Sequence, residues 1–122
     1  DQRFAIDGER AAYKYLKTLP EKEIYTDSRS IMTFNYLSGY NADNINSFNN
    51  YVFKKPENTY ALDLSQIKDS YVVINQDMIN ILTSTKKGII FPDEIYDVPA
   101  EWILEKGVPD MGKGSILIYY VP

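Results

Sequence analysis

The sequence lacks cysteine and histidine, two residue types on which much enzyme chemistry depends. Without cysteine there is no disulfide, no thiol nucleophile and no thiolate ligand for a metal ion. Without histidine there is no Ser-His-Asp triad, no imidazole zinc site and no side chain whose ordinary pKa lies near neutrality. Any catalysis would have to use carboxylates, lysine, tyrosine or a bound ion. We therefore predict no catalytic residue and no cofactor.

Long hydrophobic runs and clusters of basic residues are also missing. No apolar stretch approaches the roughly 20 residues that a transmembrane helix needs, and lysine and arginine form no basic stripe. The net charge is −4, so we expect no nucleic-acid partner, since such binding depends on cationic side chains. The 122 residues are 44% hydrophobic and 25% charged, which indicates a single soluble domain over residues 1–122.

The spacing of apolar residues predicts alternating helices and strands. The predicted helices cover residues 7–19, 28–37 and 76–85, with one further helical turn at 63–69. The predicted strands cover residues 23–27, 70–75, 101–108 and 114–121, with a short edge strand at 50–54. The asparagine-rich region from Tyr40 to Tyr60 is otherwise predicted to be loop, because asparagine competes with regular structure through local hydrogen bonds.

This alternation is typical of an α/β fold with parallel strands. We expect a three-layer, Rossmann-like open sheet that is mostly parallel, with helices on both faces. The last two strands are joined by the glycine-containing stretch PDMGKG, which favours an antiparallel hairpin at one edge of the sheet.

The stretch IYTDSRS, residues 24–30, is where a predicted strand meets a predicted helix. Asp27 and Ser28 before an amphipathic run are typical of a helix N-cap. The alternative is a ligand site, because ligands of open parallel sheets bind beyond the carboxyl ends of the strands. In that case Asp27, Ser28, Arg29 and Asn75 would face one crevice, and Arg29 would bind a phosphate or carboxylate. The turn has no glycine, so it does not match a dinucleotide motif.

Other groups of polar residues carry less chemistry. Asp93, Glu94 and Asp97 lie close together in the sequence, as do Asp63 and Asp69, but neither group has the spacing of a calcium loop. We therefore predict no metal site. The eleven tyrosines are scattered along the chain, and we interpret most of them as half-buried packing residues.

Several stretches resemble a known family. They are AAYKYLKTLPEKEIYTDSRSIMTFNYLSGY, DLSQIKDSYVVIN, VPAEWILEK and SILIYYVP. From Ala11 to Pro122 the chain is similar to the C-terminal extracytoplasmic domain of polytopic membrane glycosyltransferases, in the dolichyl-phosphate-mannose protein mannosyltransferase-like family. The matching features are a helix ending in Leu-Pro, a strand ending in Thr-Asp, an Asp-Leu before a strand, and Pro-x-x-Trp before the final hairpin.

The resemblance implies a parent protein that transfers a sugar, such as mannose, from a polyprenyl-phosphate donor to a protein or glycolipid. The family's catalytic carboxylate lies in a loop of the membrane part, so no catalytic residue carries over to this chain. The implied partners are the transmembrane part of the same polypeptide, the sugar acceptor and the lipid-linked donor. The chain begins without methionine and ends on a predicted strand, so we expect the C-terminal tail of a longer membrane protein, on the extracytoplasmic face.

Three hypotheses follow from the sequence. The first is a non-catalytic accessory domain of a membrane glycosyltransferase. The second is a free-standing module that binds a small sugar or anion through Asp27, Ser28, Arg29 and Asn75. The third is a small enzyme with a metal ion held by carboxylates such as Asp93 and Asp97, which we do not expect.

Overall fold

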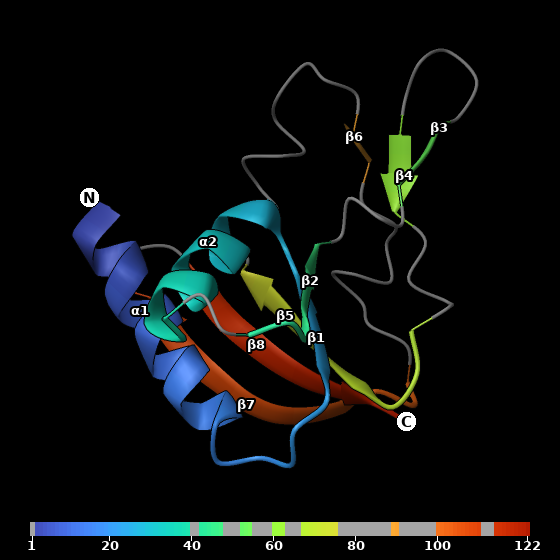
Figure 1. Cartoon of the computed structure of the whole chain (residues 1–122). Coiled ribbons are helices and arrows are strands. Elements are labelled where there is room, and N and C mark those ends of the chain that lie inside the picture. Colours follow the sequence, from blue (N-terminus) through green and yellow to red (C-terminus); the bar gives the residue numbers. More distant parts are fainter. Residues whose placement is uncertain are drawn as a thin grey trace.

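The computed structural model describes residues 2–39, 42–47, 52–54, 60–62, 67–75, 89–90, 100–110 and 114–122. These residues form two helices and eight strands in two sheets (Figure 1). In chain order the elements are α1 (Gln2–Leu16), β1 (Glu23–Thr26), α2 (Ser28–Leu37), β2 (Ile45–Ser47), β3 (Val52–Lys54), β4 (Tyr60–Leu62), β5 (Ser70–Asn75), β6 (Ile89–Ile90), β7 (Ile103–Asp110) and β8 (Gly114–Val121).

The main sheet has five strands in the order β2-β1-β5-β8-β7. The pairs β1–β2 and β1–β5 are parallel, whereas β5–β8 and β7–β8 are antiparallel. The prediction of an α/β fold with parallel strands and a C-terminal antiparallel hairpin at the sheet edge is therefore confirmed. The sheet is mixed rather than mostly parallel, because only the β2-β1-β5 side is parallel. A β-bulge interrupts the hairpin between Leu104 and Lys106.

The first helix differs from its prediction at both ends. It starts at Gln2 rather than Asp7 and ends at Leu16 rather than Leu19. After Leu16 the chain tightens, because the backbone N–H groups of Thr18 and Leu19 donate to carbonyls three residues back, at 2.9 and 3.1 Å. Pro20 follows this tightened turn, and its ring cannot continue a helix.

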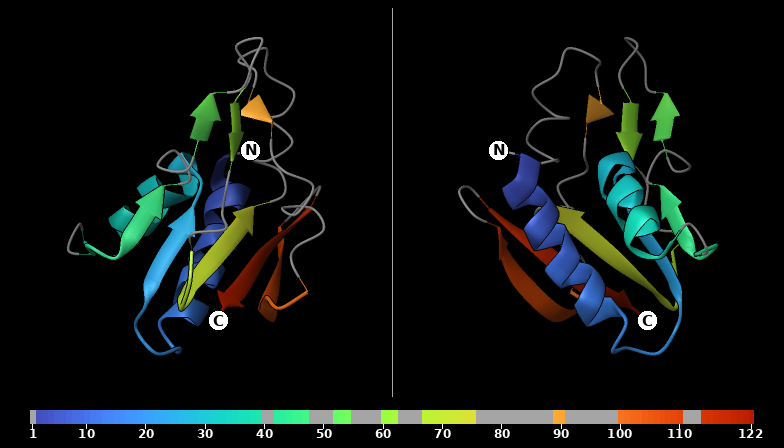
Figure 2. Two further views of the ribbon diagram at one scale, coloured as in Figure 1. Left: turned by 90° about the vertical axis from the view of Figure 1, so that its right-hand side faces the viewer. Right: turned by 60° about the vertical axis from the view of Figure 1, so that its left-hand side comes forward.

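Both helices lie on the same face of the main sheet (Figure 2). Their inner sides build the core with alternate residues of the strands: Ala12, Leu16, Ile24, Phe34, Tyr71, Val73, Val108, Ile116 and Ile118. The alternate residues of β5 that face the other way, Val72 and Ile74, are buried too. Both faces of β5 are thus covered, as the continuous apolar run SYVVIN predicts.

The asparagine-rich region contains more regular structure than the sequence predicts. The edge strand expected at 50–54 appears as β3, but β2 and β4 were not predicted. Strands β3, β4 and β6 form the small second sheet, which lies at the end of the molecule where β1 and β5 terminate (Figure 2). Residues 67–69 are not helical, and the predicted helix at 76–85 lies outside the described residues.

Candidate functional site

The carboxyl ends of β1 and β5 are the place where this topology would put a ligand. The two strands are parallel neighbours, with Ile24 opposite Tyr71 and Tyr25 opposite Val72. After β1 the chain continues through α2 to β2 on one side, whereas β7 and β8 lie on the other side of β5. Within the main sheet, the strand that follows β1 and the strands that follow β5 therefore lie on opposite sides of this pair, the arrangement at which open α/β sheets bind ligands. Along the chain, β6 of the second sheet comes between β5 and β7. The ligand-site alternative requires β1 and β5 to be neighbours, and the structure pairs them.

Asp27 caps the helix that starts at this edge. It has extended backbone angles, φ −72° and ψ 162°, and its side chain accepts two hydrogen bonds from Ser30. Oδ1 accepts from the backbone N–H at 2.9 Å, and Oδ2 accepts from the hydroxyl at 2.8 Å. Both residues are buried. The N-cap interpretation of the Asp-Ser pair is therefore confirmed, with Asp27 as the cap and Ser28 as the first helical residue.

The other candidate residues are placed only in part. Ser28 and Arg29 form the first positions of α2, and their side chains lie outside the described residues. Asn75 is the last residue of β5 and is buried on the face that carries Tyr71 and Val73. Asp63, Asp93, Glu94 and Asp97 lie outside the described residues.

Glu9 is a buried carboxylate that the sequence prediction missed, with only 1% of its surface exposed. It lies one helical turn before Tyr13, whose ring is 5.7 Å from that of Phe34. Ser30 lies one turn before Phe34, and both helices run away from the same end of the molecule (Figure 2). The spacing of Glu9 from Ala12 and Leu16, three and seven residues, was the sequence signal for burial.

Buried polarity is concentrated at this end of the molecule. Among the described residues six polar side chains are buried, and four lie here: Thr26, Asp27, Ser30 and Asn75. The hydroxyl of Thr26 donates to the carbonyl of Val73 at 3.0 Å, which joins β1 to β5 next to Asp27. Because both Asp27 oxygens are already bonded and complement the helix dipole, an anion at this helix end would face a carboxylate. The geometry therefore favours a structural role for Asp27, as the helix cap between β1 and α2, over anion binding.

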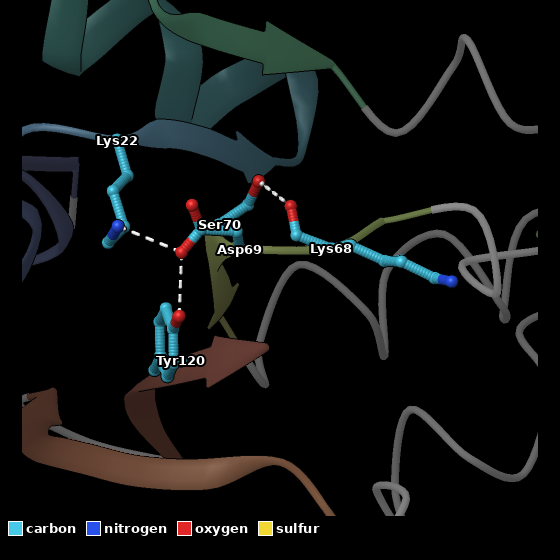
Figure 3. A network of polar contacts seen from close by, with 5 residues as sticks. All are labelled: Lys22, Lys68, Asp69, Ser70 and Tyr120. Atoms are coloured by element: carbon cyan, nitrogen blue, oxygen red, sulfur yellow. Dashed lines mark hydrogen bonds and ion pairs between the residues drawn. The ribbon is translucent and has the colours of Figure 1, made fainter. Parts of the chain in front are cut away.

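A second polar network lies at the opposite end of the sheet, where β1 and β5 begin and β8 ends (Figure 3). Oδ1 of Asp69 is 2.8 Å from the ammonium nitrogen of Lys22 and accepts a hydrogen bond from the Tyr120 hydroxyl at 2.6 Å. Asp69 has a φ of 49°, a left-handed conformation that aspartate tolerates better than most residues. The Ser70 hydroxyl donates to the carbonyl of Lys68 at 2.8 Å.

The protonation states in this network oppose acid–base chemistry near neutral pH. Hydrogen bonds from Lys22 and Tyr120 lower the pKa of Asp69. The same contacts raise the pKa of Lys22 and the pKa of the Tyr120 hydroxyl, in both cases chiefly through the hydrogen bond to Asp69. Each group is thus held further from a pKa of 7, whereas a general acid or base works best near the ambient pH. We interpret the network as a clamp on the three strands that meet here.

Two further observations bear on function. In the parts of the chain that the structure describes, no group of three or more acidic residues is arranged to hold a metal ion. Neither of the two described helices is long and apolar enough to cross a lipid bilayer.

Comparisons with known proteins found no relative of this chain. A scan of protein-family models, a search of curated proteins and a search of solved structures each found no match to the chain. The assignment to a mixed α/β fold therefore rests on the architecture described above.

Proposed function

We propose that the chain is a non-catalytic accessory domain of a membrane glycosyltransferase, one that takes a sugar such as mannose from a polyprenyl-phosphate donor. The proposal starts from the resemblance over residues 11–122 and from the extracytoplasmic location that it implies. Its partners would be the transmembrane part of the same polypeptide and the protein or glycolipid acceptor. Its role would be to pack on the membrane part or to guide the acceptor.

The pairing of Asp27 with Ser30 is the observation that carries the non-catalytic part of the proposal. A catalytic carboxylate at the edge of the sheet has to reach a substrate. Asp27 is buried, and each of its oxygens is bonded to Ser30 within its own helix start. The carboxylate that the topology places at the expected ligand edge is thus committed to holding α2.

Deleting residues 1–122 from the parent protein tests whether the membrane part carries the catalysis and this domain only assists transfer to the acceptor. Parent and truncated proteins would be reconstituted in liposomes with a radiolabelled polyprenyl-phosphate sugar and an acceptor fraction from the same cells. We expect the truncated protein to keep cleaving the donor while transfer to the acceptor falls. The separately produced 122-residue chain should leave the donor intact. Donor turnover by that chain alone would contradict the proposal.

A three-layer, Rossmann-like arrangement is the architecture we propose for the complete domain. Both described helices cover one face of the sheet, yet Val72 and Ile74 on the other face are 0% and 1% exposed. This burial supports a third layer on that face, for which the helix predicted at 76–85 is the candidate. Backbone chemical shifts of residues 76–85 test it: helical shifts are expected, and extended shifts would contradict the arrangement.

A free-standing module that binds a small sugar or anion is the second candidate function. It is favoured by the order of the main sheet, in which β2 and the β7–β8 hairpin lie on opposite sides of β1 and β5, and by the buried Asn75 at the end of β5. Titrations with mannose and with inorganic phosphate, followed by amide NMR, test this function. Saturable shifts at Asp27–Ser30 and Asn75 that Arg29→Ala abolishes would support it. Unchanged spectra would count against it.

A further inference from the structure

A pocket of about 160 Å³ lies at the amino ends of β1, β2 and β5, on the face of the sheet that carries the helices. It is bounded by the end of α1, by the connection from α1 to β1, and by the start of β2. Its surface is apolar where Leu16, Leu19, Ile24 and Ile45 line it. It lies at the opposite end of the sheet from Asp27 and Asn75.

The size of the pocket sets an upper bound on its occupant. A cavity of roughly 150 Å³ lined by aliphatic and aromatic side chains can hold one benzene ring. The present pocket is of this size, and the tyrosines Tyr13 and Tyr71 are part of its wall. A single ring therefore fits, whereas a larger ligand would have to extend into solvent.

The rim of the pocket carries charges of both signs. Lys17 and Lys22 contribute two ammonium groups, and Glu21 contributes the opposing carboxylate. The Lys22 ammonium group forms an ion pair with Asp69. The Lys17 nitrogen lies 5.8 Å from the centre of the Tyr13 ring. Lys17 is thus the ammonium group placed beside an aromatic wall at the exposed mouth of the pocket.

The hydrogen-bonding groups of Asn44, in the wall of the pocket, are already in use. The Asn44 side-chain amide donates to the Lys22 carbonyl at 2.7 Å, and the Asn44 carbonyl accepts from the Ile24 N–H at 2.8 Å. These groups already hold β1 to the start of β2. A pyranose needs partners for several hydroxyls, and leaving such groups unbonded against the aliphatic floor would be costly.

We propose that this pocket binds a small anion built on one apolar ring, with the ring over the aliphatic floor and the carboxylate or phosphate at Lys17. The inference is independent of the proposed function, because it rests on a different end of the sheet. It assigns a ligand class to a surface that the sequence did not single out.

Amide NMR on the intact chain tests the proposal with benzoate, phenyl phosphate, inorganic phosphate and glucose 6-phosphate. Benzoate or phenyl phosphate should produce saturable shifts around Lys17, Leu19, Glu21, Asn44 and Ile45, with dissociation constants in the low-millimolar range for so small a ligand. Inorganic phosphate should bind at least tenfold more weakly than phenyl phosphate. Equal affinity for inorganic phosphate or for glucose 6-phosphate would overturn the proposal, as would shifts that do not saturate.

Variants separate the two parts of the proposed site. Lys17→Gln should weaken binding of phenyl phosphate about threefold, since one exposed charge is removed. Lys14→Gln, on an exposed position of the same helix, is the matched control and should leave binding unchanged. Ala42→Phe should fill the pocket and abolish binding while the dispersed amide spectrum is kept. Equal binding by the wild type and Lys17→Gln would overturn the assignment of the anion to Lys17.

Discussion

Both carboxylate oxygens of Asp27 are bonded to Ser30, Oδ1 to its backbone N–H at 2.9 Å and Oδ2 to its hydroxyl at 2.8 Å. This pair fixes the direction in which the chain leaves β1 and enters α2. It also occupies the position at which many parallel sheets bind a ligand. The stretch IYTDSRS is therefore a structural connection between β1 and α2. Its contribution to the free energy of unfolding can be measured.

Replacing Asp27 by alanine should destabilise the fold. The variant removes a helix cap, an effect of about 0.5–2 kcal/mol, and leaves the Ser30 N–H buried without its acceptor. We therefore expect a loss of unfolding free energy near the upper end of that range in urea denaturation. Asp27→Asn keeps an acceptor for the N–H and should lose less. Equal stability of wild type and Asp27→Ala would contradict the cap.

Phe34 joins the two helices, because it is fully buried and its ring contacts that of Tyr13. Truncation to alanine should cost about 3–5 kcal/mol of unfolding free energy, from lost burial and the cavity that remains. Met32 lies on the same helix with 72% of its surface exposed, so Met32→Ala should stay within about 0.5 kcal/mol of wild type. Urea titration of both variants checks the packing of α2, and similar losses would contradict it.

The Lys22–Asp69–Tyr120 network should make stability depend on pH at both extremes. The pKa of Asp69 is lowered from 3.8, so its contribution is present above that value and is lost as the pH falls through the lowered pKa. The pKa values of Lys22 and Tyr120 are raised from 10.5 and 10.0. Their contributions are present below those values and are lost as the pH rises through the raised pKa values.

Asp69→Asn isolates these contributions from other titrations. The difference in unfolding free energy between wild type and this variant should be constant between about pH 5 and pH 9 and shrink outside that window. The effect should be modest, because Asp69 is largely exposed and solvent screens the ion pair. A difference that is the same at pH 2, 7 and 11 would contradict the titration of this network.

Gly39 ends α2 in a left-handed conformation, with φ 72°. A side chain there meets the backbone, so Gly39→Ala should cost roughly 1–2 kcal/mol of unfolding free energy, partly offset by the lower entropy of the unfolded chain. Gly39→Asn should cost less, because asparagine tolerates this conformation. Thermal melting of the two variants tests the order, and a more stable alanine variant would contradict the left-handed end.

Elements with strong local signals were predictable from the sequence. The continuous apolar run of β5, the cap and terminal glycine of α2, and the two runs of the final hairpin all appear where expected. Each of these signals depends on residues that are neighbours in the sequence. The position of the candidate edge was also predictable, because the carboxyl ends of parallel neighbours meet.

Features that depend on distant contacts were not predictable. The short strand β2 has little apolar signal of its own and forms because its residues pair with β1 along Ile24–Thr26. The burial of Glu9 depends on how α1 packs near α2. The clamp on Asp69 joins segments that are distant in the sequence, since Tyr120 lies 51 residues after Asp69. The sequence left Asp27 with two interpretations, a helix cap or a ligand residue, and the structure bonds it to Ser30 as the cap.

The central claim is that this chain functions as a domain of a membrane glycosyltransferase. An immunoblot of the source cells, with an antibody against the chain and with washed membranes beside the soluble fraction, tests it most directly. The account predicts a band several times larger than 14.1 kDa that stays in the membranes through alkaline carbonate. A band near 14.1 kDa in the soluble fraction would contradict it.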